Sequence, residues 1–218
     1  MIAVSEFFDC ADEDQRAAGV AAATAAVLKG ELVVLPTDTV YGLGADAFRP
    51  AAVTSLLQAK GRGRQMPPPV LVGSVRAASA LVEDLGPYGQ QLIDEFWPGG
   101  LTLVWRASRS LQWDLGDTKG TVAVRMPQHP VALELLQATG PMAVSSANLT
   151  GSQPVTTAAA AREQLGDSVA VYLDGGPCEA QTPSTIVDMT GEMPRLLRAG
   201  VLPIGQLREV AAVAMGPD

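Results

Sequence analysis

The sequence predicts an α/β fold, and three observations carry the prediction. Short apolar runs that suit buried strands alternate along the chain with longer segments that suit helices. Hydrophobic residues make up 47% of the 218 residues and aromatic residues only 5%, so the core must be built mainly from Ala, Val and Leu. Prolines and glycines are spread along the chain, and neither a clear linker nor a fixed-period repeat interrupts it. We therefore expect a single domain over residues 1–218.

The first helix is expected over residues 12–29. Asp12 can cap its start together with Gln15 three positions on, and Gly30 supplies a stop. The alanine-rich interior of this segment suits close packing against a sheet. This segment therefore predicts a helix that covers one face of the sheet.

A buried strand is expected next, at Leu32–Leu35. Pro36 should end it, because proline cannot donate a hydrogen bond to a central ladder. The polar residues of Thr37–Tyr41 follow directly, and in open α/β proteins ligands tend to bind just beyond strand ends. Gly42 and Gly44 are expected to lie in the same loop, where they would allow close backbone approach and unusual dihedral angles.

The remaining segments continue the alternation of strands and helices. Pro50 suits the first turn of a helix, Thr156 is a possible helix cap, and residues 107–120 are expected to form an irregular connection. Further helices are expected at residues 50–60, 75–83, 87–96, 130–139 and 156–165 and after Pro203. Further strands are expected at residues 70–72, 101–106, 121–126, 142–144, 169–173, 185–188 and 195–198.

Composition excludes several classes of function. The net charge of −8 and a pI near 4.6 argue against a broad surface for a nucleic-acid backbone. Two cysteines, Cys10 and Cys178, and the one histidine, His129, are too few for a disulfide framework, a zinc site or a supported histidine triad. We find neither a signal peptide nor an apolar run near the ~20 residues that span a bilayer. We therefore expect a soluble, cytoplasmic protein.

Polar clusters at the ends of predicted elements are the candidate binding residues. Lys60, Arg62 and Arg64 place three cations within five residues, and a point charge beside planar forks suits a polyphosphate. The hydroxyls and amide of Ser145–Asn148 could bind neutral polar groups. Taken alone, the Lys60, Arg62 and Arg64 cluster can also be a solvated basic loop. Ser145–Asn148 can also be a loop that satisfies its own backbone. Further clusters are Thr37–Tyr41, Pro183–Thr185 and Arg198.

Taken together and in this order, the clusters resemble the motifs of the YrdC/Sua5 family, the L-threonylcarbamoyladenylate synthases of tRNA modification. The resemblance covers about residues 15–205, and six motifs in the right order make it specific. The matching stretches are Pro36–Gly44, Lys60-Gly61-Arg62 (K-x-R), Val124–Pro127, Ser146-Ala147-Asn148 (S-x-N), Pro183–Val187 and Leu197–Gly200.

The resemblance implies a YrdC-like twisted open sheet with flanking helices and a concave ligand-binding face. It also implies a nucleotidyltransferase that condenses L-threonine, bicarbonate and ATP to threonylcarbamoyl-AMP and pyrophosphate, with Mg²⁺ on the phosphates. The product would serve a separate threonylcarbamoyl transferase complex that modifies adenosine 37 of ANN-decoding tRNAs. A weak contact with tRNA is compatible with this role.

The resemblance also implies roles for single residues. Lys60 and Arg62 would be catalytic, because they concentrate positive charge where a carbamate attacks the α-phosphate. No protein metal ligands are expected. Threonine would be bound by Thr37, Tyr41, Arg125 and Ser184. ATP would be bound by Lys60, Arg62, Arg64, Thr121, Ser146, Asn148, Thr156 and Arg198.

Departures from the family pattern leave some points open. Family members often have a proline directly after K-x-R and a later Pro-Leu pair, whereas Gly63-Arg64 and Pro67–Val70 stand here, so the path of residues 60–69 is open. The chain ends near residue 218, which suggests the short form without a further C-terminal domain. Two alternatives are a non-catalytic RNA-binding protein of the same fold and a carbamoyl-adenylate enzyme with another acceptor.

Overall fold

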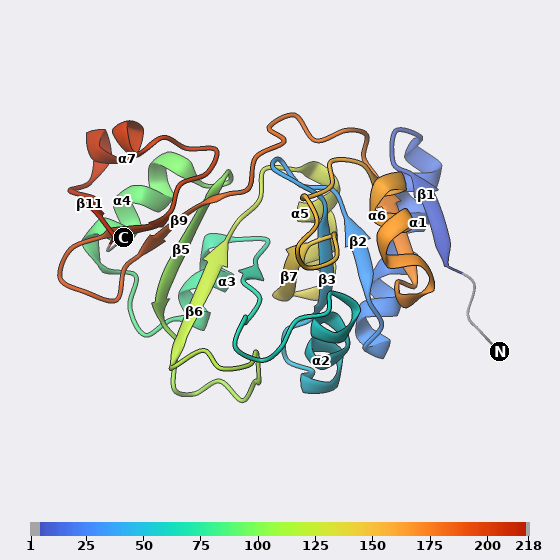
Figure 1. Cartoon of the computed structure of the whole chain (residues 1–218), viewed down its shortest axis with the longest axis horizontal. Helices are drawn as coiled ribbons and strands as arrows, with labels where there is room; N and C mark the ends of the chain where they lie inside the picture. The colour runs from blue at the N-terminus through green and yellow to red at the C-terminus, as the bar shows by residue number, and fades with distance from the viewer. Residues whose placement is uncertain (1–4, 217–218) are drawn as a thin grey trace.

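The computed structural model describes residues 5–216, whose strands form one mixed, eleven-stranded sheet (Figure 1). The strands are β1 (Glu6–Asp9), β2 (Val33–Leu35), β3 (Gly42–Asp46), β4 (Val70–Leu71), β5 (Leu101–Arg106), β6 (Thr121–Arg125), β7 (Met142–Ser146), β8 (Val171–Asp174), β9 (Thr185–Asp188), β10 (Arg195–Arg198) and β11 (Ala214–Met215). The helices are α1 (Glu13–Lys29), α2 (Pro50–Ala59), α3 (Val75–Leu81), α4 (Gly86–Phe96), α5 (Pro130–Thr139), α6 (Ala158–Leu165) and α7 (Ile204–Val210). The spatial order of the strands is β1-β8-β2-β3-β7-β4-β6-β5-β9-β10-β11.

The predicted α/β fold with a large open sheet and flanking helices is confirmed, and α1 shows how local signals set its elements. The Asp12 side chain accepts a hydrogen bond from the backbone N–H of Gln15 at 2.9 Å, which caps the start of the helix. Gly30 ends the helix in the left-handed conformation with φ 90°. Within residues 5–216, no helix is long and apolar enough to cross a membrane.

The sequence does not predict three of the strands, and it predicts one helix cap a residue too early. β1 and β11 are short strands at the two edges of the sheet. The sequence predicts a loop at β3, because Gly-Leu-Gly-Ala-Asp lacks the β-branched residues that favour strands. Its pairing with β2 and β7 overrides that low propensity. Thr157, not Thr156, caps α6, because its side chain accepts from the N–H of Ala160.

Two apolar clusters lie on opposite faces of the sheet around β2. Val33 and Leu35 belong to one cluster and Val34 to the other, because successive side chains of a strand point to opposite faces. Helices α1 and α5 cover the first face, and α2 and α6 cover the second (Figure 1). This half of the sheet is therefore buried on both sides.

The half of the sheet around β5 and β6 has helices on one face only. Leu101, Leu103 and Trp105 of β5 are buried in the cluster that also contains residues of α3, α4 and α7. Thr102 and Val104 alternate with them and therefore point to the opposite face. In Figure 1, α3 lies behind β5 and β6, and none of the described helices is drawn in front of them. That uncovered face can receive a ligand.

Gly42 and Gly44 act through their small size. Neither has a positive φ, so the predicted unusual dihedral angles are wrong. The predicted close approach is present: a Cβ on Gly42 would lie 2.6 Å from Cγ1 of Val144, and one on Gly44 would lie 2.7 Å from Cε of Met142. Both neighbours belong to β7, so the glycines allow β3 and β7 to pair with large side chains beside them.

We expect Gly42→Ala to lower the free energy of unfolding by about 1–3 kcal/mol, because the added methyl group overpacks the contact with Val144. Val144→Ala in the same chain should make room for it. Urea unfolding of both single variants and the double variant would measure the coupling energy. A Gly42→Ala protein as stable as the parent, with no coupling to position 144, would contradict this account.

Candidate active site

A cavity of about 540 Å³ opens on the uncovered face of the sheet. Its size is within the range of small-molecule binding sites. Its apolar residues on the strands are Gly42, Leu71, Val104, Ala123, Val144, Ile186 and Leu197. Its hydroxyl and amide groups come from Thr37, Thr39, Thr102, Ser145, Ser146, Asn148, Ser152 and Ser184. The alternation that buries one face of each strand therefore leaves the other face to build the cavity floor.

Three guanidinium groups line this cavity, those of Arg62, Arg125 and Arg198. No described residue of the lining carries a carboxylate. Burial lowers the pKa of Arg198, and the positive charges of Arg125 and Arg62 lower it further. The three guanidinium groups are therefore close enough to repel one another, and their combined positive charge attracts anionic ligands to the cavity.

The Arg125 guanidinium donates hydrogen bonds to three groups of the protein. Its Nε donates to the carbonyl of Gly99 at 2.9 Å, Nη1 to Oγ1 of Thr39 at 2.8 Å, and Nη2 to Oδ1 of Asp38 at 2.6 Å. A guanidinium has five N–H groups, so one remains on each terminal nitrogen. Those two N–H groups could bind a carboxylate in a bidentate pair.

Thr37 and Ser184 are fixed by their own hydrogen bonds. The Thr37 hydroxyl donates to the carbonyl of Val40 at 2.6 Å. Oγ of Ser184 lies 2.8 Å from Oγ1 of Thr102, and the Ser184 carbonyl accepts from Nη2 of Arg198 at 2.7 Å. Two small hydroxyl side chains from distant parts of the sequence are thus preorganised on one cavity.

Lys60 and Asn148 join the K-x-R and S-x-N segments below the cavity. Nζ of Lys60 donates to the carbonyls of Ser146 and Asn148, the latter at 2.5 Å. Lys60 is only 1% exposed, and burial together with the Arg62 charge lowers its pKa from 10.5 to about 7. Oδ1 of Asn148 is buried without a hydrogen-bond partner among the described residues, so it can accept from a ligand.

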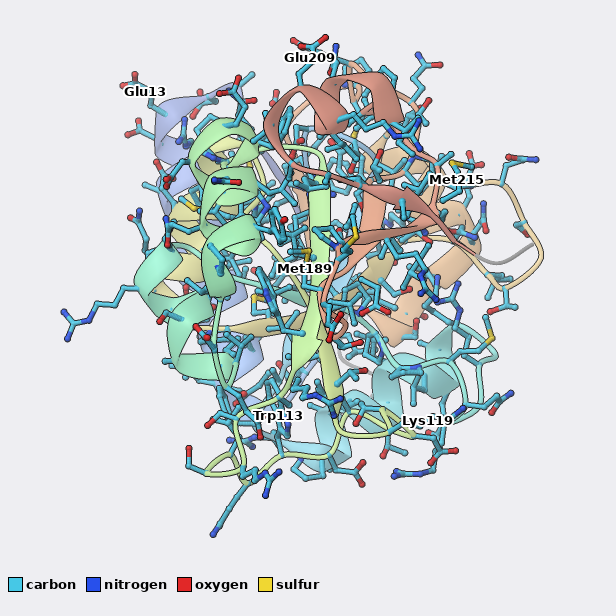
Figure 2. The ribbon with its side chains drawn as sticks, turned by 90° about the vertical axis from the view of Figure 1, so that its left-hand side faces the viewer. Glu13, Trp113, Lys119, Met189, Glu209 and Met215 are labelled. Carbon is cyan, nitrogen blue, oxygen red and sulfur yellow. The ribbon has the colours of Figure 1, made fainter. Side chains whose placement is uncertain are left out.

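Arg62 and Arg64 point to different places although they are two residues apart. Nη1 of Arg62 donates to Oγ of Ser145 at 3.0 Å beside the cavity. Arg64 forms a bidentate pair with Asp114 at 3.0 and 2.8 Å, and its carbonyl accepts from the N–H of Asp117. The connection 107–120 therefore holds Arg64 away from the cavity. Trp113 and Lys119 of this connection lie at the opposite end of the molecule from Glu209 of α7 (Figure 2).

The structure brings most of the predicted site residues to one cavity. Thr37, Tyr41, Arg62, Arg125, Ser146, Asn148, Ser184 and Arg198 line it. Lys60, Arg64, Thr121 and Thr156 do not belong to the described lining. Tyr41 is fully buried, and its hydroxyl donates to the carbonyl of Gly176 at 2.7 Å, which directs the hydroxyl to the loop after β8. For all of these residues, the predicted contacts with threonine or ATP stay predictions.

Sequence reasoning did not assign Thr39, Thr102, Ser145 or Ser152 to the site. Thr39 and Ser145 belong to polar clusters that the sequence does show, but nothing local indicates which hydroxyl turns toward the cavity. Thr102 had a usable signal, since it is a polar residue between two apolar residues of a strand. Its alternation with buried Leu101 and Leu103 places it on the open face.

The comparison with protein families decides the classification. The Sua5–YciO–YrdC family model, described as "Telomere recombination", matches residues 25–200. The chain belongs to this family. The resemblance found in the sequence is thus confirmed.

Curated members of the Sua5–YciO–YrdC family match most of the chain. A relative from Mycobacterium tuberculosis, named provisionally as a threonylcarbamoyl-AMP synthase, is 57% identical over 96% of this chain and 97% of its own length. The threonylcarbamoyl-AMP synthase of Pyrococcus abyssi is 36% identical over 84% of this chain and 54% of its own length.

Solved structures of the family share the fold. P. abyssi Sua5 complexed with L-threonine has a TM-score of 0.89 at 33% identity, covering 98% of this chain and 63% of that one. Escherichia coli YciO has a TM-score of 0.82 at 25% identity, covering 92% of this chain and 98% of that one. Their likeness agrees with the large open sheet described above.

We expect Asp38→Asn to lower the free energy of unfolding by about 3 kcal/mol, because it leaves the buried Arg125 without its counter-charge. The matched control is Glu134→Gln, which removes the partner of Arg16 in a solvent-exposed pair. It should cost no more than about 1 kcal/mol. Chemical unfolding of the two variants measures both values. Equal costs would contradict the role given to the buried pair.

Proposed function

We propose that this chain is an L-threonylcarbamoyladenylate synthase, which condenses L-threonine, bicarbonate and ATP to threonylcarbamoyl-AMP and pyrophosphate. One observation carries the proposal: a relative whose structure contains L-threonine aligns over 98% of this chain. The cavity on the open face of this chain, lined by three arginines, supports it. The relatives named threonylcarbamoyl-AMP synthase support the same activity.

The threonine subsite would lie beside β6 and β9. The two free N–H groups of Arg125 suit the threonine carboxylate, and the hydroxyls of Thr37 and Ser184 suit the amino-acid side chain. The main chain of Tyr41 would close this part of the cavity. In the reaction, bicarbonate adds to the threonine amine with loss of water, and the carbamate oxygen becomes the nucleophile.

The nucleotide would bind across the cavity, beside β7 and β10. Arg62 and Arg198 supply positive charge, and Ser146 and Asn148 supply hydrogen-bonding groups. The carbamate oxygen attacks the α-phosphate, and the bond to pyrophosphate breaks. Bringing two unit negative charges to ~4 Å costs about 4 kcal/mol at an effective dielectric constant of 20, so fixed cations around the reacting groups favour the step.

Mg²⁺ is proposed to arrive with the nucleotide. Among residues 5–216, no group of three or more His, Cys, Asp or Glu side chains could hold a metal ion. The hydroxyl-rich lining fits a cation held mainly by phosphate oxygens, a common mode for Mg²⁺, which keeps several of its waters. Bound there, it would neutralise phosphate charge. Arg62 and Arg198 would still orient the phosphates.

The fate of the product follows from the proposed reaction. A mixed anhydride of a carbamate and AMP is reactive, so a separate transferase must take it up. We propose that this transferase is a threonylcarbamoyl transferase complex that modifies adenosine 37 of ANN-decoding tRNAs. We also propose that the protein acts in the cytoplasm. The net charge of −8 disfavours a broad surface for a nucleic-acid backbone, so we propose only a weak tRNA contact.

We expect pyrophosphate release from ATP and bicarbonate to require L-threonine and Mg²⁺. A coupled pyrophosphate assay with a panel of amino acids measures this requirement, and labelled bicarbonate should appear in the nucleotide product. Omission of Mg²⁺ should abolish turnover. Faster release with another amino acid would favour a different acceptor. Salt-dependent tRNA binding without any turnover would favour the RNA-binding alternative.

We expect Arg62→Ala to lower kcat/KM about ten- to hundredfold, since a hydrogen bond to a charged phosphate is lost. Arg64→Ala should have a much smaller effect, because the Arg64 guanidinium is paired with Asp114 outside the cavity. Steady-state kinetics of the two variants compare neighbouring arginines of the same loop. An equal loss in both would show that Arg64 leaves Asp114 to contact ATP.

A further inference from the structure

A second cavity shares Thr37 with the cavity of the candidate active site. Its volume is about 410 Å³, within the range of small-molecule sites. Residues 36–38, 128–130 and 175–179 line it, and these three loops follow β2, β6 and β8. β2 and β8 are parallel neighbours, and in α/β proteins ligands often bind outside the carboxyl ends of such strands. The second cavity therefore lies where a ligand is expected.

Hydrogen bonds hold the loop after β8, so this wall of the second cavity is preformed. The Tyr41 hydroxyl donates to the carbonyl of Gly176 at 2.7 Å and accepts from the N–H of Gly175 at 3.0 Å. The N–H of Cys178 donates to the carbonyl of Thr156 at 2.8 Å. A ligand that enters a preformed cavity loses less affinity to the ordering of loops.

The two cavities carry opposite charge. Three arginines and no described carboxylate line the first. The described lining of the second cavity contains the carboxylates of Asp38 and Glu179, and neither lysine nor arginine. Burial lowers the pKa of His129, so its imidazole stays neutral at neutral pH. The second cavity is therefore negative and suits a cation.

The second cavity also has hydrogen-bond acceptors to spare. Nδ1 of His129 is buried without a partner among the described residues, and it can accept when the ring proton is on Nε2. The charges of Asp38 and Glu179 both act on His129, so the three groups lie close together. Oδ1 of Asp38 accepts from Nη2 of Arg125 and from the N–H of Gln128, whereas no described residue donates to its Oδ2. A cation with several N–H donors would satisfy these acceptors.

We propose that the second cavity binds an organic cation, an alkylammonium or guanidinium group, and that this cation tightens the binding of threonine. Asp38 lines the second cavity and Arg125 the first, so their ion pair lies between the two ligands. A cation beside Asp38 offsets the negative charge that repels the threonine carboxylate from Arg125. By linkage, threonine must tighten cation binding by the same factor. The coupling rests on the proposed function, and the cation site does not.

Titration of the ligand-free protein with n-butylguanidinium and n-butylammonium tests the cation site. We expect saturable changes in the NMR shifts of the backbone amides in residues 36–38, 128–130 and 175–179. n-Butanol, a neutral molecule of similar length, should leave these signals unchanged. Equal shifts with n-butanol, or no saturable shift in these loops with either cation, would overturn the proposal.

Glu179→Gln removes one carboxylate of the second cavity at an exposed position, where the fold should tolerate the change. We expect the Kd for n-butylguanidinium to rise about threefold, the effect of losing an exposed ion pair. The matched control is Glu209→Gln, an exposed residue of α7 outside the described lining (Figure 2), which should leave the Kd unchanged. Equal effects of the two variants would overturn the proposal, because the cation would then follow only the net charge.

Calorimetry with L-threonine tests the coupling between the two cavities. We expect saturating n-butylguanidinium to lower the Kd for threonine about fivefold. An unchanged Kd for threonine would overturn the coupling. A protein that binds the cation in the second cavity but binds no threonine would refute the proposed function and support the cation site.

Two further probes separate the sources of such a cation. Nα-acetyl-L-arginine amide represents a basic side chain of a protein partner, and spermidine represents a free polyamine. The probe that binds the second cavity more tightly identifies the source, and either result supports the cation site. Amide shifts confined to other parts of the protein with both probes would overturn it.

Discussion

The structure depends on holding three guanidinium groups around one cavity. Arg125 is the most constrained, since its donors are divided among the Gly99 carbonyl, the Thr39 hydroxyl and the Asp38 carboxylate. Arg62 and Arg198 are held by neutral oxygens, and the described lining carries no carboxylate. The positive charge facing the cavity is therefore only partly compensated by the protein. Anionic ligands would complete it, which is the electrostatic preorganisation that a reaction between two anions requires.

The sheet makes this arrangement possible through its two faces. Alternate residues of β5 and β6 are buried against helices, and the residues between them form the cavity floor. Small residues at Gly42 and Gly44 let β3 lie beside the large side chains of β7. β7 then ends in the S-x-N turn, which Lys60 joins to α2. The cavity residues that come from distant segments thus depend for their positions on a few tightly packed or buried contacts.

Much of the fold could be predicted because its signals are local. Asp12 and Gly30 bound α1, and the apolar runs of β2 and β5 identify buried strands. β3 could not be predicted in the same way, since Gly42 and Gly44 lower its strand propensity and only pairing with distant strands makes it regular. The division of the chain into one domain stays a prediction.

The site shows the same division between local and long-range information. Motif order was enough to gather Thr37, Arg125 and Ser184, but not to separate Arg62 from Arg64, whose partner Asp114 is fifty residues away. A crystal structure with L-threonine and a non-hydrolysable ATP analogue tests the central claim most directly. We predict the threonine carboxylate within about 3 Å of the Arg125 guanidinium, and the α-phosphate between Arg62 and Arg198. Either ligand bound outside this cavity would contradict the account.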